Sequence, residues 1–123
     1  MTKLVIPGIP PSINEWRNMH HHQEAKLKKE WEDIVGWEVL RQKAKPPKPI
    51  RKAVTTYRYY FPTKHRRDPS NYSPKWLEDG LVKAGVLEDD SFENVNLEIV
   101  HGGVDKENPR VEIEIREVEM DAS

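Results

Sequence analysis

The stretch AVTTYRYYF, residues 53–61, decides the class of fold. Its density of Val, Thr and Tyr is typical of a β-strand, because β-branched and aromatic side chains pack well on a pleated surface. Tyr57, Tyr59 and Phe61 occur at every second position, which predicts a half-buried strand with these three rings in the core. Pro62 ends the strand, because proline has no N–H to donate to a neighbouring strand.

The sequence predicts a helix on each side of this strand. The upstream helix runs from Gln23 to about Lys43, where apolar residues recur at spacings of three and four: Leu27, Trp31, Ile34, Val35 and Val39. The downstream helix begins at Ser73-Pro74, a typical N-cap followed by proline at the first helical position, and ends near Gly85. Residues 13–22 are polar and aromatic without a clean period, so we expect a loop there.

Three further strands are predicted, at Lys3–Ile6, Asn94–His101 and Arg110–Val118. The connection Gly102–Pro109 is rich in turn residues, so we expect the last two strands to form an antiparallel hairpin. The order β-α-β-α-β-β predicts an α+β fold, in which two helices pack on a small mixed or antiparallel sheet. We expect one domain covering residues 1–123.

The composition excludes several classes of protein. The chain has no cysteine, which excludes a disulfide scaffold, a thiol nucleophile and cysteine-ligated zinc. No apolar run approaches the ~20 residues that cross a bilayer, so we expect no membrane association. The opening MTKLVIPGIPP has only a three-residue apolar run and does not resemble a secretory signal, so a cytoplasmic location is expected.

The charges are distributed unevenly along the chain. Residues 1–75 contain 16 Lys and Arg against 7 Asp and Glu, whereas residues 76–123 contain 4 against 14. A near-neutral chain of this kind can still present a basic surface, and a basic surface indicates a polyanionic partner. The basic residues also fit the solvated face of a helix, so charge alone leaves both interpretations open.

Chemistry-bearing residues concentrate between His65 and Asp90. Asp68 follows two arginines, Lys75 lies in the first turn of the predicted helix, and three acids, Glu88, Asp89 and Asp90, follow that helix. Carboxylates without cysteine favour a hard cation such as Mg²⁺, which can activate water for phosphodiester cleavage. Asp68 and the later acids are separated by the length of the helix, ~15–18 Å, unless Val86–Asp90 folds back along it. The same residues also fit an ordinary turn and a solvated loop.

The histidine triplet His20-His21-His22 invites interpretation as a metal site. Three consecutive imidazoles in a loop are not expected to face one ion. We instead expect a polar, DNA-facing loop that includes Arg17.

Three stretches carry a resemblance to a known family. They are PPSIN at residues 10–14, RRDPSN at residues 66–71 followed by Lys75, and DGLVKAGVL at residues 79–87 followed by Asp89-Asp90. In this order and spacing, the chain resembles the RusA family of Holliday junction resolvases. Members of that family are Mg²⁺-dependent homodimers that nick two opposing strands of a four-way DNA junction, using three aspartates and one lysine.

The resemblance implies a set of site residues. Asp68, Lys75 and Asp90 would be catalytic, and Asp68, Asp89 and Asp90 would hold Mg²⁺, with Mn²⁺ as an alternative ion. The family's second aspartate falls on Ser70, a neutral and weaker cation ligand. No small-molecule cofactor is expected. Several basic residues would contact DNA phosphates: Arg17, Lys26, Lys29, Lys64, Arg66, Arg67 and Lys75.

Ser70 leaves more than one hypothesis open. Asp79 or Asp89 compensates for the missing charge and the chain cuts junctions, or the chain is a weak or inactive junction-binding protein of the same fold. A small interaction domain with merely solubilising charges remains a third interpretation. The first hypothesis predicts that Ser70→Asp raises Mg²⁺-dependent cleavage.

Overall fold

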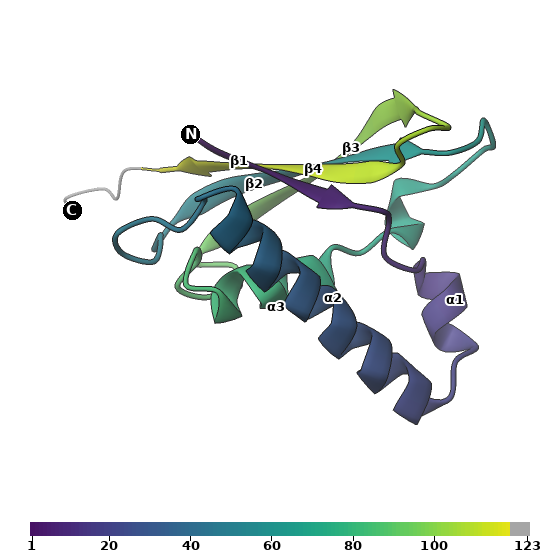
Figure 1. Cartoon of the computed structure of the whole chain (residues 1–123), viewed down its shortest axis with the longest axis horizontal. Coiled ribbons are helices and arrows are strands. Elements are labelled where there is room, and N and C mark those ends of the chain that lie inside the picture. Colours follow the sequence, from purple (N-terminus) through teal and green to yellow (C-terminus); the bar gives the residue numbers. More distant parts are fainter. Residues whose placement is uncertain (119–123) are drawn as a thin grey trace.

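The computed structural model describes residues 1–118, which form a four-stranded mixed sheet with its helices on one face (Figure 1). The α+β class predicted from the sequence is confirmed, and the longer elements follow the predicted order. Along the chain the elements are β1 (Thr2–Pro7), α1 (Ile13–Arg17), α2 (His21–Arg41), β2 (Ala53–Phe61), the 3-10 turn η1 (Pro69–Asn71), α3 (Lys75–Lys83), β3 (Val95–Val104) and β4 (Arg110–Glu117).

The strands lie in the order β1-β4-β2-β3. Strand β4 is antiparallel to both β1 and β2, whereas β3 runs parallel to β2 with Val95 opposite Ala53. The predicted hairpin between the last two strands is therefore wrong, because β4 inserts between β1 and β2. Burial explains the placement: Ile113 of β4 is fully buried, as a central strand requires, whereas Leu97 of β3 is 43 % exposed at the sheet edge.

The hydrophobic core lies between the sheet and helices α2 and α3. Tyr57 of β2, Leu77 and Leu81 of α3 and Val35 of α2 are all completely buried in it. The helices approach closely at Gly80, where a Cβ atom would lie 2.8 Å from the Cβ of Val35. This close contact fixes α3, whose first turn carries the candidate site, against α2 and the sheet.

The segment expected to be a loop at residues 13–22 contains helix α1 and the start of α2, so that prediction is wrong. A capping box explains the start of α1, because the Ser12 side chain accepts from the Glu15 N–H and the Glu15 carboxylate accepts from the Ser12 N–H. Trp16 of α1 then stacks on Trp76 of α3, with 4.7 Å between ring centroids. The spacing Ser-x-x-Glu at residues 12–15 is the sequence pattern that indicates the start of this helix.

The chain reverses direction directly after α3. Gly85 adopts a φ of 79°, a left-handed conformation that favours glycine, and the Val86 N–H bonds back to the Leu81 carbonyl at 2.9 Å. Leu87 then pairs with Ile50 in a parallel bridge. The segment that follows α3 is thereby directed back towards the start of the same helix, which positions Asp90.

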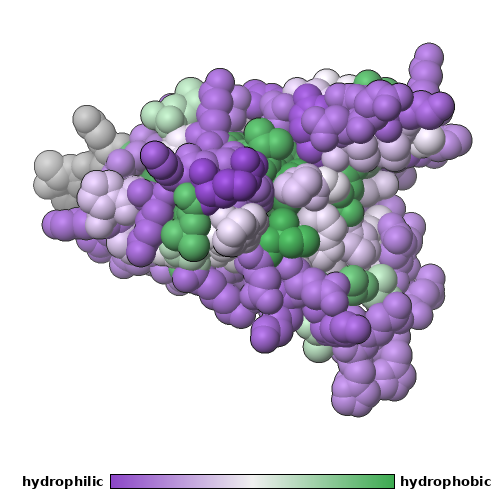
Figure 2. All heavy atoms as spheres, in the orientation of Figure 1, coloured by the Kyte–Doolittle hydropathy of each residue, from purple (hydrophilic) through white to green (hydrophobic). Residues whose placement is uncertain are grey.

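The surface is mostly hydrophilic. Figure 2 shows hydrophobic atoms gathered in the middle of the face viewed, with hydrophilic residues around them. Among residues 1–118, no helix is long and apolar enough to cross a membrane.

Candidate functional site

Lys75 is the centre of the candidate site. It is the first residue of α3, and its ammonium donates to Asp90 Oδ2 at 2.7 Å and lies 3.1 Å from Asp79 Oδ1, one helical turn later. The hydrogen bond with Asp90 raises the pKa of Lys75, and the same bond lowers the pKa of Asp90. Lys75 and Asp90, both predicted from the sequence as site residues, are therefore in contact and both charged. The contact forms because the chain folds back along α3 after that helix ends.

Helix α2 adds further charges to this site. Lys28 lies 3.4 Å from Asp79 Oδ2 and 3.9 Å from the buried carboxylate of Glu32, which also pairs with Lys83. The hydrogen bond with Glu32 raises the pKa of Lys83. The resulting charge cluster alternates lysines and acids across the α2–α3 contact: Lys28, Glu32, Lys75, Asp79, Lys83 and Asp90.

A buried polar group lies on the sheet side of α3. Glu78, the residue next to Asp79, is 6 % exposed, and its Oε1 accepts from the Thr55 hydroxyl at 3.3 Å. Burial raises the pKa of Glu78. The Tyr57 hydroxyl beside it is buried without a hydrogen-bond partner among the described residues, and burial raises the Tyr57 pKa as well. Buried titratable groups of this kind are common beside functional sites.

Asp68 belongs to a different set of contacts. Its carboxylate is 60 % exposed and lies 3.3 Å from the Arg66 guanidinium. It precedes η1 and lines a cavity of about 140 Å³ against the far ends of β2 and β3. In residues 1–118, no group of three potential ligands that includes Asp68 has its ligand atoms within 4.8 Å of one another.

Asp89 does not reach the Lys75 ammonium. Its carboxylate is exposed and accepts the backbone N–H of Asp90 at 2.8 Å. Of the two residues considered as replacements for the missing aspartate, Asp79 is the one that the fold brings to Lys75 and Asp90.

Ser70 lies exposed in η1, two residues after Asp68. Its neighbour Asn71 accepts the backbone N–H of Asn14 through its side-chain oxygen, at 3.1 Å. Two of the stretches that carry the family resemblance, residues 10–14 and 66–71, are therefore in direct contact.

The basic residues predicted to bind DNA divide into two groups. Arg67 is engaged internally: its guanidinium donates to the Thr63 carbonyl and hydroxyl, each at 2.8 Å, and stacks 4.2 Å above the Phe61 ring. It therefore holds the loop after β2 in place. The other six are exposed, with Lys75 paired to Asp79 and Asp90 and Arg66 paired to Asp68: Arg17, Lys26, Lys29, Lys64, Arg66 and Lys75.

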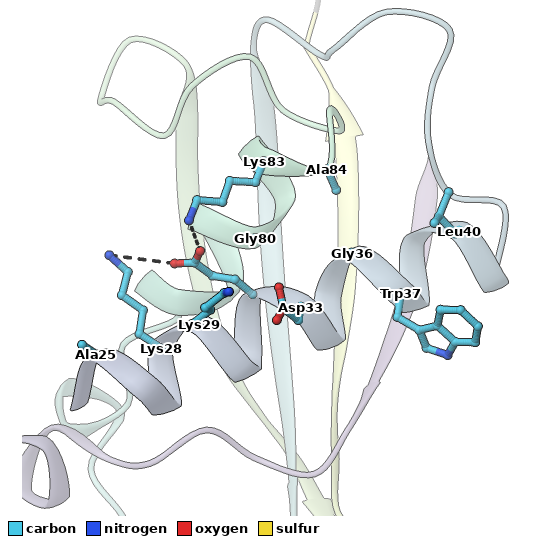
Figure 3. A pocket seen from close by; sticks show the side chains of 11 residues that line it. Ala25, Lys28, Lys29, Asp33, Gly36, Trp37, Leu40, Gly80, Lys83 and Ala84 are labelled. Atoms are coloured by element: carbon cyan, nitrogen blue, oxygen red, sulfur yellow. Dashed lines mark hydrogen bonds and ion pairs between the residues drawn. The ribbon is translucent and has the colours of Figure 1, made fainter. Parts of the chain in front are cut away.

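An open groove of about 610 Å³ runs between α2 and α3. Figure 3 shows lysines, including Lys29 and Lys83, towards one end, whereas Trp37 and Leu40 project at the other. The side chains of Trp37 and Leu40 are 66 % and 69 % exposed. Gly36 lies between the two ends and has open space where a side chain would be. The groove thus has a charged end, with both lysines and acids, and an apolar end.

The histidine triplet lies at the start of α2. The imidazole ligand atoms of His20, His21 and His22 all lie within 4.8 Å of one another, so the expectation that they cannot face one ion is wrong. His20 is the N-cap, because its Nδ1 accepts the His22 N–H at 3.2 Å. Metal binding through that nitrogen would remove the cap.

Several cluster residues were not predicted from the sequence. Lys28 and Glu32 resemble ordinary surface residues of an amphipathic helix, and only their packing against α3 reveals them. Glu78, which lies outside this cluster on the sheet side of α3, had a weak signal, because it follows Pro74 by four residues and lies beside the buried Leu77.

No protein-family model matches the chain, and no curated protein matches it.

Proposed function

We propose that the chain is a Mg²⁺-dependent, structure-specific endodeoxyribonuclease that resolves four-way DNA junctions by paired, symmetric phosphodiester nicks. One observation carries the proposal: the fold-back after α3 brings Asp90 onto Lys75, with Asp79 on the same ammonium. These are a lysine and an aspartate that the resemblance to RusA resolvases implies, and 15 residues separate them in the sequence. The proposal includes a cytoplasmic location, as the sequence led us to expect.

The donor set fits a hard divalent cation. Asp79 and Asp90 direct carboxylate oxygens to one point, where the Lys75 ammonium now lies. Mg²⁺ binds proteins through one or two carboxylates and keeps several waters, and Mn²⁺ accepts the same ligands. Asp79 and Asp90 would hold the ion, whereas a part for Asp68 in holding it stays a prediction. When bound, the ion supplies an activated water and charge stabilisation.

The chain's own residues account for substrate binding at this site. Lys75 is 54 % exposed, so its ammonium can contact a phosphate once the ion has taken its place between Asp79 and Asp90. The exposed side chains of Lys64 and Arg66 extend the positive surface beyond η1. Because phosphate contacts release counterions, DNA binding should weaken steeply as salt rises.

A homodimer completes the proposal. A four-way junction presents two equivalent strands, and a two-fold symmetric dimer places one site on each. The apolar end of the α2–α3 groove, with Trp37 and Leu40 exposed, offers the surface for a second copy of the chain (Figure 3). Large exposed side chains beside a groove are typical of such contacts.

A second function has its own support. Ser70 supplies no charge, and Asp68 does not contact Asp90 or Lys75 among the described residues. Both features fit a protein that binds junctions without cutting them. Binding would then use the same basic surface, and only a cleavage assay separates the two functions.

The test uses the purified chain with a synthetic four-way junction and a linear duplex of the same arms. A mobility shift selective for the junction, followed by symmetric nicks on addition of Mg²⁺, supports the nuclease. A selective shift without nicks in Mg²⁺ or Mn²⁺ supports the binding protein. Equal and weak binding of both DNAs contradicts both functions.

A further inference from the structure

The cavity beside Asp68 has several aromatic rings in its lining, together with Arg67, Pro69, Ile99 and Val100. It lies between the ends of β2 and β3 and the segment that carries η1, and its volume is about 140 Å³. Tyr59 and Phe61 come from β2, Tyr72 follows η1, and His101 comes from β3. Asp68 also lines the cavity, and its carboxylate pairs with Arg66. The cavity is separate from the contacts of Lys75 and from the α2–α3 groove.

Contacts among the lining residues hold the walls in place. The Phe61 ring lies 5.1 Å from Tyr72 and 5.3 Å from His101, measured between ring centroids, and Tyr59 lies 5.6 Å from Tyr72. Arg67 covers Phe61 and is anchored through its hydrogen bonds to Thr63. A ligand would therefore enter a preformed site, which keeps the entropic cost of binding low.

The size of the cavity limits the ligand to one aromatic ring. An apolar protein cavity of about 150 Å³ accommodates a single benzene molecule. A volume of about 140 Å³ thus suits a six-membered ring and is small for two fused rings. Aromatic walls favour a ligand with a π-face, as in the stacking of unpaired bases on protein side chains.

The polar groups identify the kind of ring. Asp68 accepts hydrogen bonds, and the exposed His101 imidazole offers a donor and an acceptor. Heterocycles with N–H and carbonyl edges match such groups, whereas a hydrocarbon ring does not. Arg66, 89 % exposed and paired with Asp68, places a cation beside the cavity for an attached phosphate.

From this combination we propose that the cavity binds one unstacked pyrimidine base of the DNA substrate, with its phosphate on Arg66. The inference rests on the proposed action on DNA and adds a base-binding subsite to it. The subsite would favour sites where a pyrimidine leaves the helical stack close to the nicked strand. Unstacking is easiest at a junction, where stacking is already interrupted.

The experiment measures nucleotide binding without cleavage. The full chain is titrated with thymidine and deoxyadenosine 5′-monophosphates, and amide NMR shifts are recorded. We expect the pyrimidine nucleotide to shift the amide resonances of Ile99, Val100 and His101. The purine nucleotide should bind at least about fivefold more weakly, which is the smallest affinity change expected from the loss of one stacked base. Equal binding of both nucleotides, or no shift at these residues, overturns the inference.

Variants test the walls of the cavity. Ile99→Trp fills the space and His101→Ala removes one wall, so both should weaken thymidine monophosphate binding at least about fivefold. His65→Ala is the matched control, because its exposed side chain lies outside the cavity, and it should bind as the wild type does. If His65→Ala weakens binding as much as His101→Ala does, the inference is wrong. Thermal unfolding checks that each variant folds.

Failure here and failure of the proposed function are distinguishable. If the chain nicks junctions but the nucleotide does not shift the amide resonances of residues 99–101, the base subsite is wrong and the proposed function stands. If the chain binds thymidine monophosphate at these residues but does not nick DNA, the nucleotide subsite is supported and the nuclease proposal is wrong. Arg66→Ala should reduce binding of the monophosphate and leave binding of thymidine itself unchanged, and an equal loss for both would contradict the phosphate contact.

Discussion

The Lys75 ammonium and the Asp90 carboxylate are joined by a 2.7 Å hydrogen bond. Lys75 begins α3, whereas Asp90 follows that helix and returns along it after the left-handed turn at Gly85 and the bridge from Leu87 to Ile50. Because of this return, a residue that begins α3 and a residue that follows α3 lie in one site. It also selects Asp79, which lies on the same ammonium, as the third charged member.

The first prediction concerns which aspartate replaces the family's second one. Asp79→Asn should lower Mg²⁺-dependent junction cleavage by at least about 100-fold, because several kcal/mol of metal-derived stabilisation depends on the ligands. Asp89→Asn should change it by less than about threefold, since among residues 1–118 the Asp89 carboxylate bonds only the N–H of Asp90. Single-turnover rates on a labelled junction measure both, and a greater loss for Asp89→Asn would show that the wrong residue has been assigned.

The second prediction concerns the substituted position. Ser70→Asp should raise the rate of Mg²⁺-dependent nicking, because it adds a carboxylate two residues after Asp68, where the resemblance places one. Ser70 is exposed, so stability should change by no more than about 0.5 kcal/mol. The same single-turnover assay measures the effect. If the wild type already cuts at a rate that Ser70→Asp does not improve, the missing charge is not a deficit.

The third prediction tests the packing that fixes α3. Gly80→Ala should destabilise the fold by about 1–3 kcal/mol, because the new Cβ would lie 2.8 Å from the Val35 Cβ. Gly36→Ala is the matched control: its position is helical and open, so stability should rise by about 0.5–1 kcal/mol. Urea unfolding of the three proteins at one protein concentration measures both changes. Equal effects of the two substitutions would contradict the close approach of the helices.

The fourth prediction concerns pH. The buried Glu38 accepts three hydrogen bonds from Arg41, which lower the Glu38 pKa below its usual 4.5. A lowered carboxyl pKa stabilises the fold fully above pH 4.5, and this contribution is lost as pH falls through the folded-state value. Glu38→Gln should therefore lower stability by a constant amount above pH 4.5, and its difference from the wild type should shrink at lower pH.

Urea unfolding between pH 3 and pH 7 measures this dependence. Glu30→Gln is the control, because Glu30 is exposed on the same helix and forms no ion pair in residues 1–118. A stability difference for Glu38→Gln that stays constant down to pH 3 would contradict the role of the ion pair. The pair also holds Gln42, whose side chain exchanges two hydrogen bonds with the Val5 backbone and protects the edge of β1.

Much of the fold could be predicted because its signals are local. The strand at residues 53–61 was predicted with both bounds correct, and the burial of Tyr57, Tyr59 and Phe61 is confirmed. The partner of each strand could not be predicted in this way. Residues 95–99 and 111–115 share one alternating pattern, and only long-range burial places the second stretch in the centre of the sheet.

The candidate site was predicted in its residue types and only partly in its geometry. Lys75 and Asp90 stand out in the sequence, but their contact depends on Ile50, which follows a proline-rich stretch that resembles a spacer. The contribution of Lys28 depends on how α2 crosses α3, which helical periodicity does not specify. Asp68 was expected to share an ion with Asp90, and that expectation stays a prediction.

The most direct test of the central proposal is junction cleavage by Asp90→Asn beside a charge-matched control. Glu93→Gln removes one charge from an exposed residue of the same loop that forms no ion pair in the described chain. The account predicts paired, symmetric nicks from the wild type and from Glu93→Gln in Mg²⁺, and none from Asp90→Asn, while all three proteins bind the junction. Undiminished nicking by Asp90→Asn, or no nicking by the wild type, would contradict it.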